Sequence, residues 1–194
     1  LVEPLDVRDE TSVQAFVHAG IRQFGHIDIA VNNAGIEGPF GPLHEMDISD
    51  FDNLVATNLR GIWLSLKHEL QHMVPRKQGV IINLASTAGV QAIPMVAVYS
   101  ATKHGIVGLT RGAALEQAAN GIRVNAVAPG PVDTGLLTRM ITGQVPLEVI
   151  AASIPLKRIS QPSEIAQAIL WLASGASGFV TGETLMIDGG LTQA

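Results

Sequence analysis

Hydrophobic and polar positions alternate along the chain in two different rhythms. Short runs rich in β-branched residues, such as VIINLA and IRVNAVA, predict buried strands, and longer stretches with apolar residues every three or four positions predict helices. The predicted strands are 1–6, 27–32, 80–84, 123–127 and 184–187, and the predicted helices are about 11–24, 50–74, 97–119 and 163–174. Strands that alternate with helices indicate an α/β fold built on a parallel sheet.

Composition narrows the class of protein. The 194 residues are 47% hydrophobic, which fits one globular domain spanning 1–194. With a net charge of −5 and no basic cluster longer than Arg76-Lys77, we expect no nucleic-acid partner. No apolar run approaches the roughly 18 residues of a membrane helix, so we expect no membrane partner. Without cysteine the chain has neither disulfides nor a thiolate zinc site, which permits the cytoplasmic location that we expect.

The segments that follow the predicted strands carry the candidate chemistry, because ligands of a doubly wound sheet bind beyond the carboxyl ends of its strands. These segments are NNAG at 32–35, Ser86, and PGPVDT at 129–134. Tyr99 and Lys103, in YSATK, share one helical face. A lysine cation near a tyrosine favours the tyrosinate, so the Tyr99 hydroxyl could exchange a proton with a carbonyl or alcohol oxygen that Ser86 orients.

An ordered set of motifs resembles the short-chain dehydrogenase/reductase family over essentially the whole chain. The matches are LDV at 5–7, NNAG at 32–35, Asn58, Ser86, YSATK at 99–103, VNAVAPGPVDT at 124–134 and TGETLMIDGG at 181–190. The resemblance implies a Rossmann-type doubly wound sheet and hydride transfer between NAD(H) or NADP(H) and a secondary alcohol/ketone pair. A small-molecule carbonyl or alcohol is then the substrate.

The resemblance also implies a role for each matching residue. Tyr99 is the acid/base, Ser86 holds the substrate carbonyl, and Asn58 positions a water in a proton relay. Lys103 lowers the tyrosine pKa and binds the nicotinamide ribose. The remaining implied cofactor contacts are Asp6 and Val7 at the adenine, Asn33, Ala34 and Gly35 at the adenosine ribose, and Pro129, Gly130, Val132 and Thr134 at the nicotinamide end.

The glycine fingerprint that holds the pyrophosphate in this family does not occur in the sequence. In the strand order 3-2-1-4-5-6, residues 1–6 and 27–32 match strands 3 and 4, so the first two strands are missing and strand 4 exposes an apolar edge. We therefore expect about 50 residues before Leu1 in the natural chain. The alternative is a non-catalytic remnant or assembly partner that does not bind a dinucleotide tightly. The residue that distinguishes NAD from NADP would follow strand 2.

Two further segments concern the substrate and the assembly. Residues 135–160 form a predicted substrate lid, with apolar Leu136, Leu137, Met140, Ile141 and Ile150, and the loop between Gly35 and His44 provides a second wall. A hydrophobic or alicyclic ketone fits such walls. The helix after Tyr99 carries Gly105, Gly108 and Gly112, and family members commonly pair this helix between subunits. We therefore expect a homotetramer.

The stretch HELQH at 68–72 raises a different function, because H-E-x-x-H on a helix is a zinc-protease signature with Glu69 as general base. Zinc hydrolysis is a remote alternative. His68 and His72 fall opposite the apolar stripe of helix 50–74, toward solvent or a subunit contact, and Pro75 should end the helix. No third ligand has a familiar spacing, and we expect no metal.

Overall fold

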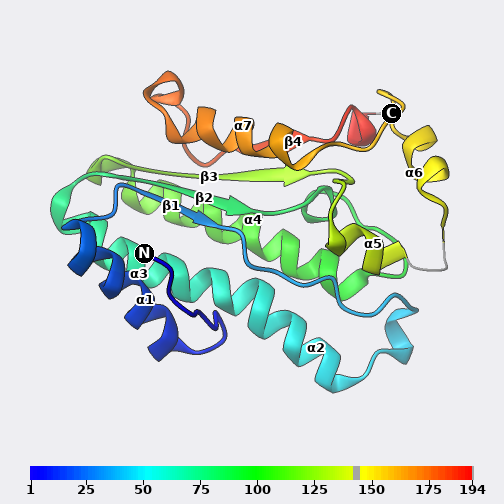
Figure 1. The fold of residues 1–194 in the computed structure, drawn as a ribbon, viewed down its shortest axis with the longest axis horizontal. Coiled ribbons are helices and arrows are strands. Elements are labelled where there is room, and N and C mark those ends of the chain that lie inside the picture. Colours follow the sequence, from blue (N-terminus) through cyan, green and yellow to red (C-terminus); the bar gives the residue numbers. More distant parts are fainter. Residues whose placement is uncertain (142–144, 194) are drawn as a thin grey trace.

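Four parallel strands form one sheet in the computed structural model, which describes residues 1–141 and 145–193 (Figure 1). The strands are β1 (Ile29–Asn32), β2 (Gly79–Leu84), β3 (Ile122–Pro129) and β4 (Thr184–Ile187), hydrogen-bonded in that order. All three neighbouring pairs are parallel. The α/β fold with a doubly wound parallel sheet is thus confirmed, and the later four predicted strands each match an observed strand within two residues.

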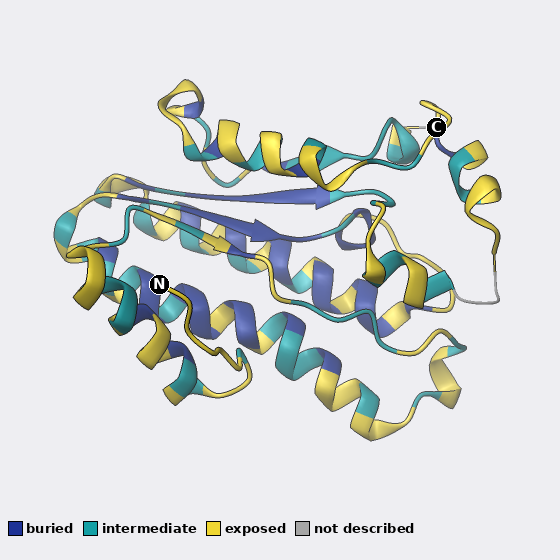
Figure 2. Cartoon of the chain, in the orientation of Figure 1, coloured by how far each residue is buried: buried dark blue, intermediate teal, exposed yellow. Residues whose placement is uncertain are grey.

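Helices cover both faces of the sheet. On one face, α3 (Gly61–Arg76) and α4 (Ala97–Gln117) pack on β2 and β3 through the largest apolar cluster, and α1 (Glu10–Phe24) packs outside α3 (Figure 1). On the other face, α7 (Pro162–Ala173) covers β2 and β3 through Ile165 and Leu172. Burial is accordingly concentrated in the central strands and the helix faces turned toward them (Figure 2). No helix in the described ranges is long and apolar enough to cross a membrane.

The predicted strand at residues 1–6 is wrong. This segment has no regular secondary structure and is exposed along its whole length. A strand needs a hydrogen-bonded neighbour, and β1, the nearest edge of the described sheet, does not pair with it. The expected apolar edge does exist, because Ile29 and Val31 of β1 remain 49% and 44% exposed.

The predicted helix at 50–74 is divided. It consists of α2 (Ile48–Leu54), a wider π-helical turn (Val55–Arg60), and α3. In the π turn, the Gly61 N–H donates to the carbonyl of Ala56, five residues back. The prediction that Pro75 ends this helix is wrong. Helix α3 continues to Arg76 and stops where Lys77 adopts a left-handed conformation (φ 53°).

Two short helices lie beyond the carboxyl ends of the strands, within the predicted lid. They are α5 (Gly135–Ile141) and α6 (Leu147–Ser153) (Figure 1). Residues 142–144 of the predicted lid lie outside the described residues. The segment after β1 is tied to α5, since the Arg139 guanidinium pairs with the Glu37 carboxylate at 2.5 Å. The sheet thus presents its carboxyl ends to a space bounded by helices and loops.

Candidate active site

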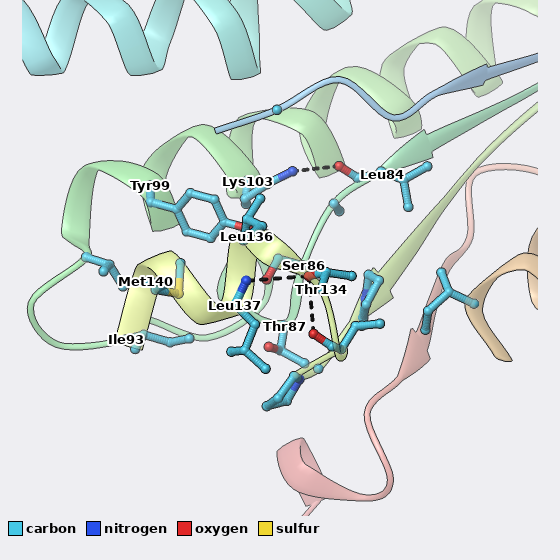
Figure 3. A pocket seen from close by; sticks show the side chains of 18 of the residues that line it. Leu84, Ser86, Thr87, Ile93, Tyr99, Lys103, Thr134, Leu136, Leu137 and Met140 are labelled. Carbon is cyan, nitrogen blue, oxygen red and sulfur yellow. Dashed lines mark hydrogen bonds between the residues drawn. The ribbon is translucent and has the colours of Figure 1, made fainter. Parts of the chain in front are cut away.

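The carboxyl ends of β1, β2 and β3 open into a cavity of about 810 Å³ (Figure 3). Its walls come from the loops that follow these strands, from the start of α4, and from α5 and α6. Ten of the predicted site residues line it: Asn33, Ala34, Gly35, Ser86, Tyr99, Lys103, Pro129, Gly130, Val132 and Thr134. The structure therefore gathers around one cavity residues that are as far apart in the sequence as Asn33 and Thr134.

Ser86 and Tyr99 present their hydroxyl groups to this cavity from adjoining elements. Ser86 follows β2 in an extended conformation, and its Oγ accepts a hydrogen bond from the Ala88 N–H at 3.1 Å. Tyr99 lies in the first turn of α4 and points toward Ser86 (Figure 3). The pKa of the Tyr99 hydroxyl is raised, chiefly by burial and to a smaller extent by the negative charge of Glu37. A hydrogen bond with Ser86 acts in the opposite direction and lowers this pKa.

Lys103 lies one helical turn after Tyr99, as its spacing predicts, and is only 6% exposed. Its Nζ donates a hydrogen bond to the Leu84 carbonyl at the end of β2, at 2.8 Å, and lies 5.6 Å from the centroid of the Tyr99 ring. Burial lowers the pKa of Lys103 to about 8. The sequence predicts that Lys103 lowers the pKa of Tyr99, but in this structure the effect of burial is the largest and the pKa of Tyr99 is raised.

Asn58 is fully buried behind the cavity wall and does not line the cavity. Its Oδ1 accepts from the Ile36 N–H and its Nδ2 donates to the Ile36 carbonyl, both at 2.8 Å. A Cβ added at Gly35 would lie 3.4 Å from Asn58 Oδ1 and 3.7 Å from Lys103 Nζ. Glycine at position 35 therefore lets the loop after β1 pass close to both polar groups.

Asp6 and Val7 lie away from this cavity. The Asp6 carboxylate is exposed and pairs with Arg8 at 2.8 Å, and hydrogen bonds from Arg8 lower its pKa to about 2. Val7 packs against Gly61 and lines a second cavity, of about 360 Å³, between α1, β1 and α3. Asn33 and Ala34 line both cavities, so the chain at the end of β1 separates them.

Apolar side chains form most of the remaining wall of the large cavity. The apolar residues predicted for the lid all line it, together with Phe40 from the loop after β1: Leu136, Leu137, Met140, Ile141 and Ile150. Arg139 of α5 also reaches this wall, where Glu37 holds it. An apolar space with a few converging polar groups suits a small organic substrate.

The HELQH stretch does not have the predicted orientation. His68 was expected to face solvent or a subunit contact, but it is only 6% exposed because it lies beside Glu10 of α1. Glu69 is only 7% exposed and accepts a hydrogen bond from Asn32 of β1. His72 Nε2 lies 3.2 Å from the Ile27 nitrogen, on the N-terminal side of β1. Within residues 1–141 and 145–193, no three His, Cys, Asp or Glu side chains are grouped so that they could hold a metal ion.

Sequence reasoning missed a buried row of polar side chains beneath the cavity. Glu69, Asn32, Asn83 and Thr110 are hydrogen-bonded in that order, and all four are buried. The available signal was the asparagine near the end of each of two apolar strands, in AVNN and IINL. Polar groups in such strands require partners, because a buried unpaired amide is costly.

Comparison with known proteins places this geometry in a family. Residues 2–192 match the family described as enoyl-(acyl carrier protein) reductase. Cis-4-hydroxycyclohexanecarboxylate dehydrogenase of Sinomonas cyclohexanicum is 43% identical over 190 residues, which are 96% of this chain and 74% of that protein. Levodione reductase of Leifsonia aquatica is 38% identical over 195 residues, covering 97% of this chain and 73% of its own.

Solved structures agree with the sequence matches. A crystal structure of levodione reductase superposes with a TM-score of 0.97 at 38% identity, covering 100% of this chain and 78% of that one. The structure of ElxO with NADP bound superposes with a TM-score of 0.92 at 37% identity, covering 98% of this chain and 77% of the ElxO chain. On these matches and its ordered strand-end motifs, the chain belongs to the short-chain dehydrogenase/reductase family of oxidoreductases.

Proposed function

We propose that this protein is a NAD(P)-dependent oxidoreductase that interconverts a secondary alcohol and a ketone, with Tyr99 as the acid/base. The observation that carries the proposal is the convergence of the Tyr99 and Ser86 hydroxyls on one cavity, with buried Lys103 behind them. Proton transfer from a positioned hydroxyl needs this proximity to the reacting oxygen.

The cavity residues fit the nicotinamide and ribose end of a dinucleotide. Lys103 supplies a buried cation and Tyr99 a hydroxyl, while Gly35 and Gly130 keep the neighbouring backbone free of side chains. Asn33 to Gly35 on one wall and Pro129 to Thr134 on the other would hold the cofactor. A bound nicotinamide accepts or delivers the hydride, and the protein supplies position and the proton. The relative ElxO was solved with NADP, and the proposal covers NAD as well as NADP.

The hydroxyl groups would act on the substrate oxygen. Ser86 donates a hydrogen bond that orients this oxygen, and Tyr99 gives it a proton during ketone reduction and takes the proton back during alcohol oxidation. Asn58 holds the loop after β1 through Ile36, and we retain it as the residue that positions the relay water behind Lys103.

The substrate we propose is an apolar cyclic alcohol or ketone. Aliphatic side chains of α5 and α6 dominate one wall, and only Arg139 and Lys103 bring cations to the described lining. The names of two relatives indicate ring substrates: a hydroxycyclohexanecarboxylate and a dichlorocyclohexadienediol. A cavity of about 810 Å³ accommodates a single substituted ring beside a nicotinamide.

The test is spectrophotometric. The purified protein is mixed with NAD(H) or NADP(H) and a panel of cyclic and open-chain secondary alcohols and ketones, and absorbance of the reduced nicotinamide is followed. We expect faster turnover with the cyclic members, and a loss of at least about 100-fold in kcat for Tyr99→Phe without a change in the circular dichroism spectrum. Unchanged turnover by Tyr99→Phe would remove Tyr99 from the mechanism. If the wild-type protein binds neither cofactor, the non-catalytic alternative replaces this proposal.

We also propose that α4 mediates assembly into a homotetramer. A Cβ added at Gly108 or Gly112 would meet no atom within 4 Å among the described residues, so this face of α4 leaves room for a close neighbour. Light scattering should give four times the chain mass. Gly108→Gln should lower that mass, and a monomeric wild-type protein would contradict the proposal.

A further inference from the structure

We propose that Glu69, the central acid of HELQH, is a positioning residue that sets cofactor affinity by fixing the end of β1 between the two cavities. The proposal rests on the proposed function insofar as it concerns the cofactor. Glu69 lies on α3 and is not among the residues that line the large cavity. Its effect must therefore pass through its neighbours.

Glu69 begins a continuous row of hydrogen bonds through the protein interior. The Asn32 side-chain amide donates to Glu69 Oε2 at 3.1 Å and to Asn83 Oδ1 at 3.0 Å, which uses both of its hydrogens. Asn83 Nδ2 then donates to Thr110 Oγ1 at 3.0 Å, and the Thr110 hydroxyl donates to the Ile106 carbonyl at 2.8 Å. Because these groups are buried, removing one partner leaves another polar group unpaired.

Each element in this row also carries part of the candidate active site. Asn32 precedes the cavity residues Asn33 and Ala34, and Asn83 precedes Leu84, whose carbonyl accepts from Lys103. Thr110 lies on α4 about two helical turns beyond Lys103. The row therefore fastens the ends of β1 and β2 to each other and to the helix that bears the proposed acid/base.

The position of β1 makes Glu69 the sensitive end of the row. Strand β1 pairs with β2 in a register that ends at Asn32 opposite Asn83, so the two amides of the row lie side by side at the last paired residues. Glu69 accepts one of the two Asn32 amide hydrogens and Asn83 accepts the other, so Glu69 is the acceptor that ties Asn32 to α3. Without that acceptor the end of β1 is free to shift, and Asn33 and Ala34 shift with it. Burial raises the pKa of Glu69 to about 7, and both its ionised and its neutral form can accept this hydrogen bond.

The experiment compares Glu69→Leu with Glu69→Gln, which keeps an amide oxygen as acceptor. Leu66→Ala is the matched control, because Leu66 is buried on the same helix and lies outside the polar row. For Glu69→Leu we expect the KM of the cofactor to rise about tenfold with kcat changed less than about twofold, as one lost buried hydrogen bond implies. Glu69→Gln should restore the wild-type KM, and Leu66→Ala should lower stability without raising KM.

Hydrogen exchange gives a second readout that does not depend on turnover. Glu69→Leu should accelerate exchange of the amides of residues 29–36 relative to those of β3, and Glu69→Gln should not. If the wild-type protein turns out inactive, the proposed function fails and this exchange pattern alone decides the positioning role. Should Glu69→Leu not fold, Thr110→Val removes the other end of the row, with the same expected pattern. Unchanged KM and uniform exchange in the variant that folds, or an equal KM rise in Leu66→Ala, would overturn the proposal.

Discussion

Removing the charge of Glu69 should change how stability depends on pH. Glu69 is only 7% exposed, and burial raises the folded-state pKa of its carboxyl from an ordinary 4.5 to about 7. The folded protein therefore binds this proton more tightly than the unfolded chain does. Glu69→Gln keeps the size and an acceptor oxygen for Asn32, and removes the ionisation.

The magnitude follows from the difference between the two pKa values. At 1.36 kcal/mol for each pKa unit, a rise from 4.5 to about 7 corresponds to about 3 kcal/mol. Below pH 4.5 the proton is bound in both states, and the stability it confers is fully present. As pH rises from 4.5 through 7, the unfolded state loses its proton first, so the free energy of unfolding falls. Above pH 7 both states are ionised and the loss is complete.

The assay is urea denaturation of wild type and Glu69→Gln at several pH values from 4.5 to 8. The difference between the two proteins cancels the contribution of other titrating groups. It should grow with pH in favour of Glu69→Gln by about 3 kcal/mol, or roughly 6–12 °C in Tm. Glu45→Gln is the matched control, since Glu45 is exposed, and it should follow wild type. If the free energy of unfolding of Glu69→Gln and of wild type changed in parallel with pH, the raised folded-state pKa of Glu69 would be refuted.

Three other predictions concern single contacts. Lys103→Met removes the donor to a buried carbonyl at the end of β2 and should lower the free energy of unfolding by about 1–3 kcal/mol in urea, along with turnover. A urea midpoint of Lys103→Met equal to that of wild type would show that the hydrogen bond from Lys103 to the Leu84 carbonyl does not stabilise the fold. Glu37→Gln removes a charge that raises the pKa of Tyr99, so the limb of the pH–rate profile that reports Tyr99 should move to lower pH. An unmoved limb would show that this charge does not reach Tyr99. Gly121→Ala would force a side chain at φ +69° to within 2.6 Å of the Lys77 carbonyl and should cost about 1–3 kcal/mol of stability, as thermal denaturation will show. A neutral effect would mean that this turn relaxes freely.

The sequence predicts the sheet and the cavity well because both depend on local signals. Buried strands such as 80–84 are continuous apolar runs, and residues after parallel strands meet at one edge whatever their separation along the chain. Ten of the thirteen proposed contact and catalytic residues line one cavity for this reason; Asp6, Val7 and Asn58 do not.

The features that escaped prediction depend on contacts between distant segments. Residues 1–6 have strand-like composition but no neighbouring strand among the described residues. The periodicity of α3 identifies one apolar face and cannot reveal that α1 packs on the opposite face, which is why His68 was assigned to solvent or a subunit contact. The pKa of Tyr99 likewise reflects its burial, which a one-turn spacing to Lys103 does not convey.

The π turn at Val55–Arg60 means that the number of residues in the helical segment from α2 to α3 matters as much as their identity. A π turn is an α-helical turn with one residue inserted, and each residue of a helix rotates the direction of the following side chains by about 100°. The insertion sets the phase at which Leu54, before the turn, packs with Tyr99 while Ile62, after it, packs with the sheet cluster. A chain one residue shorter here would keep every motif of the family and still turn either Leu54 or Ile62 away from its cluster. A scan of substitutions would pass over this requirement, and only insertions and deletions expose it.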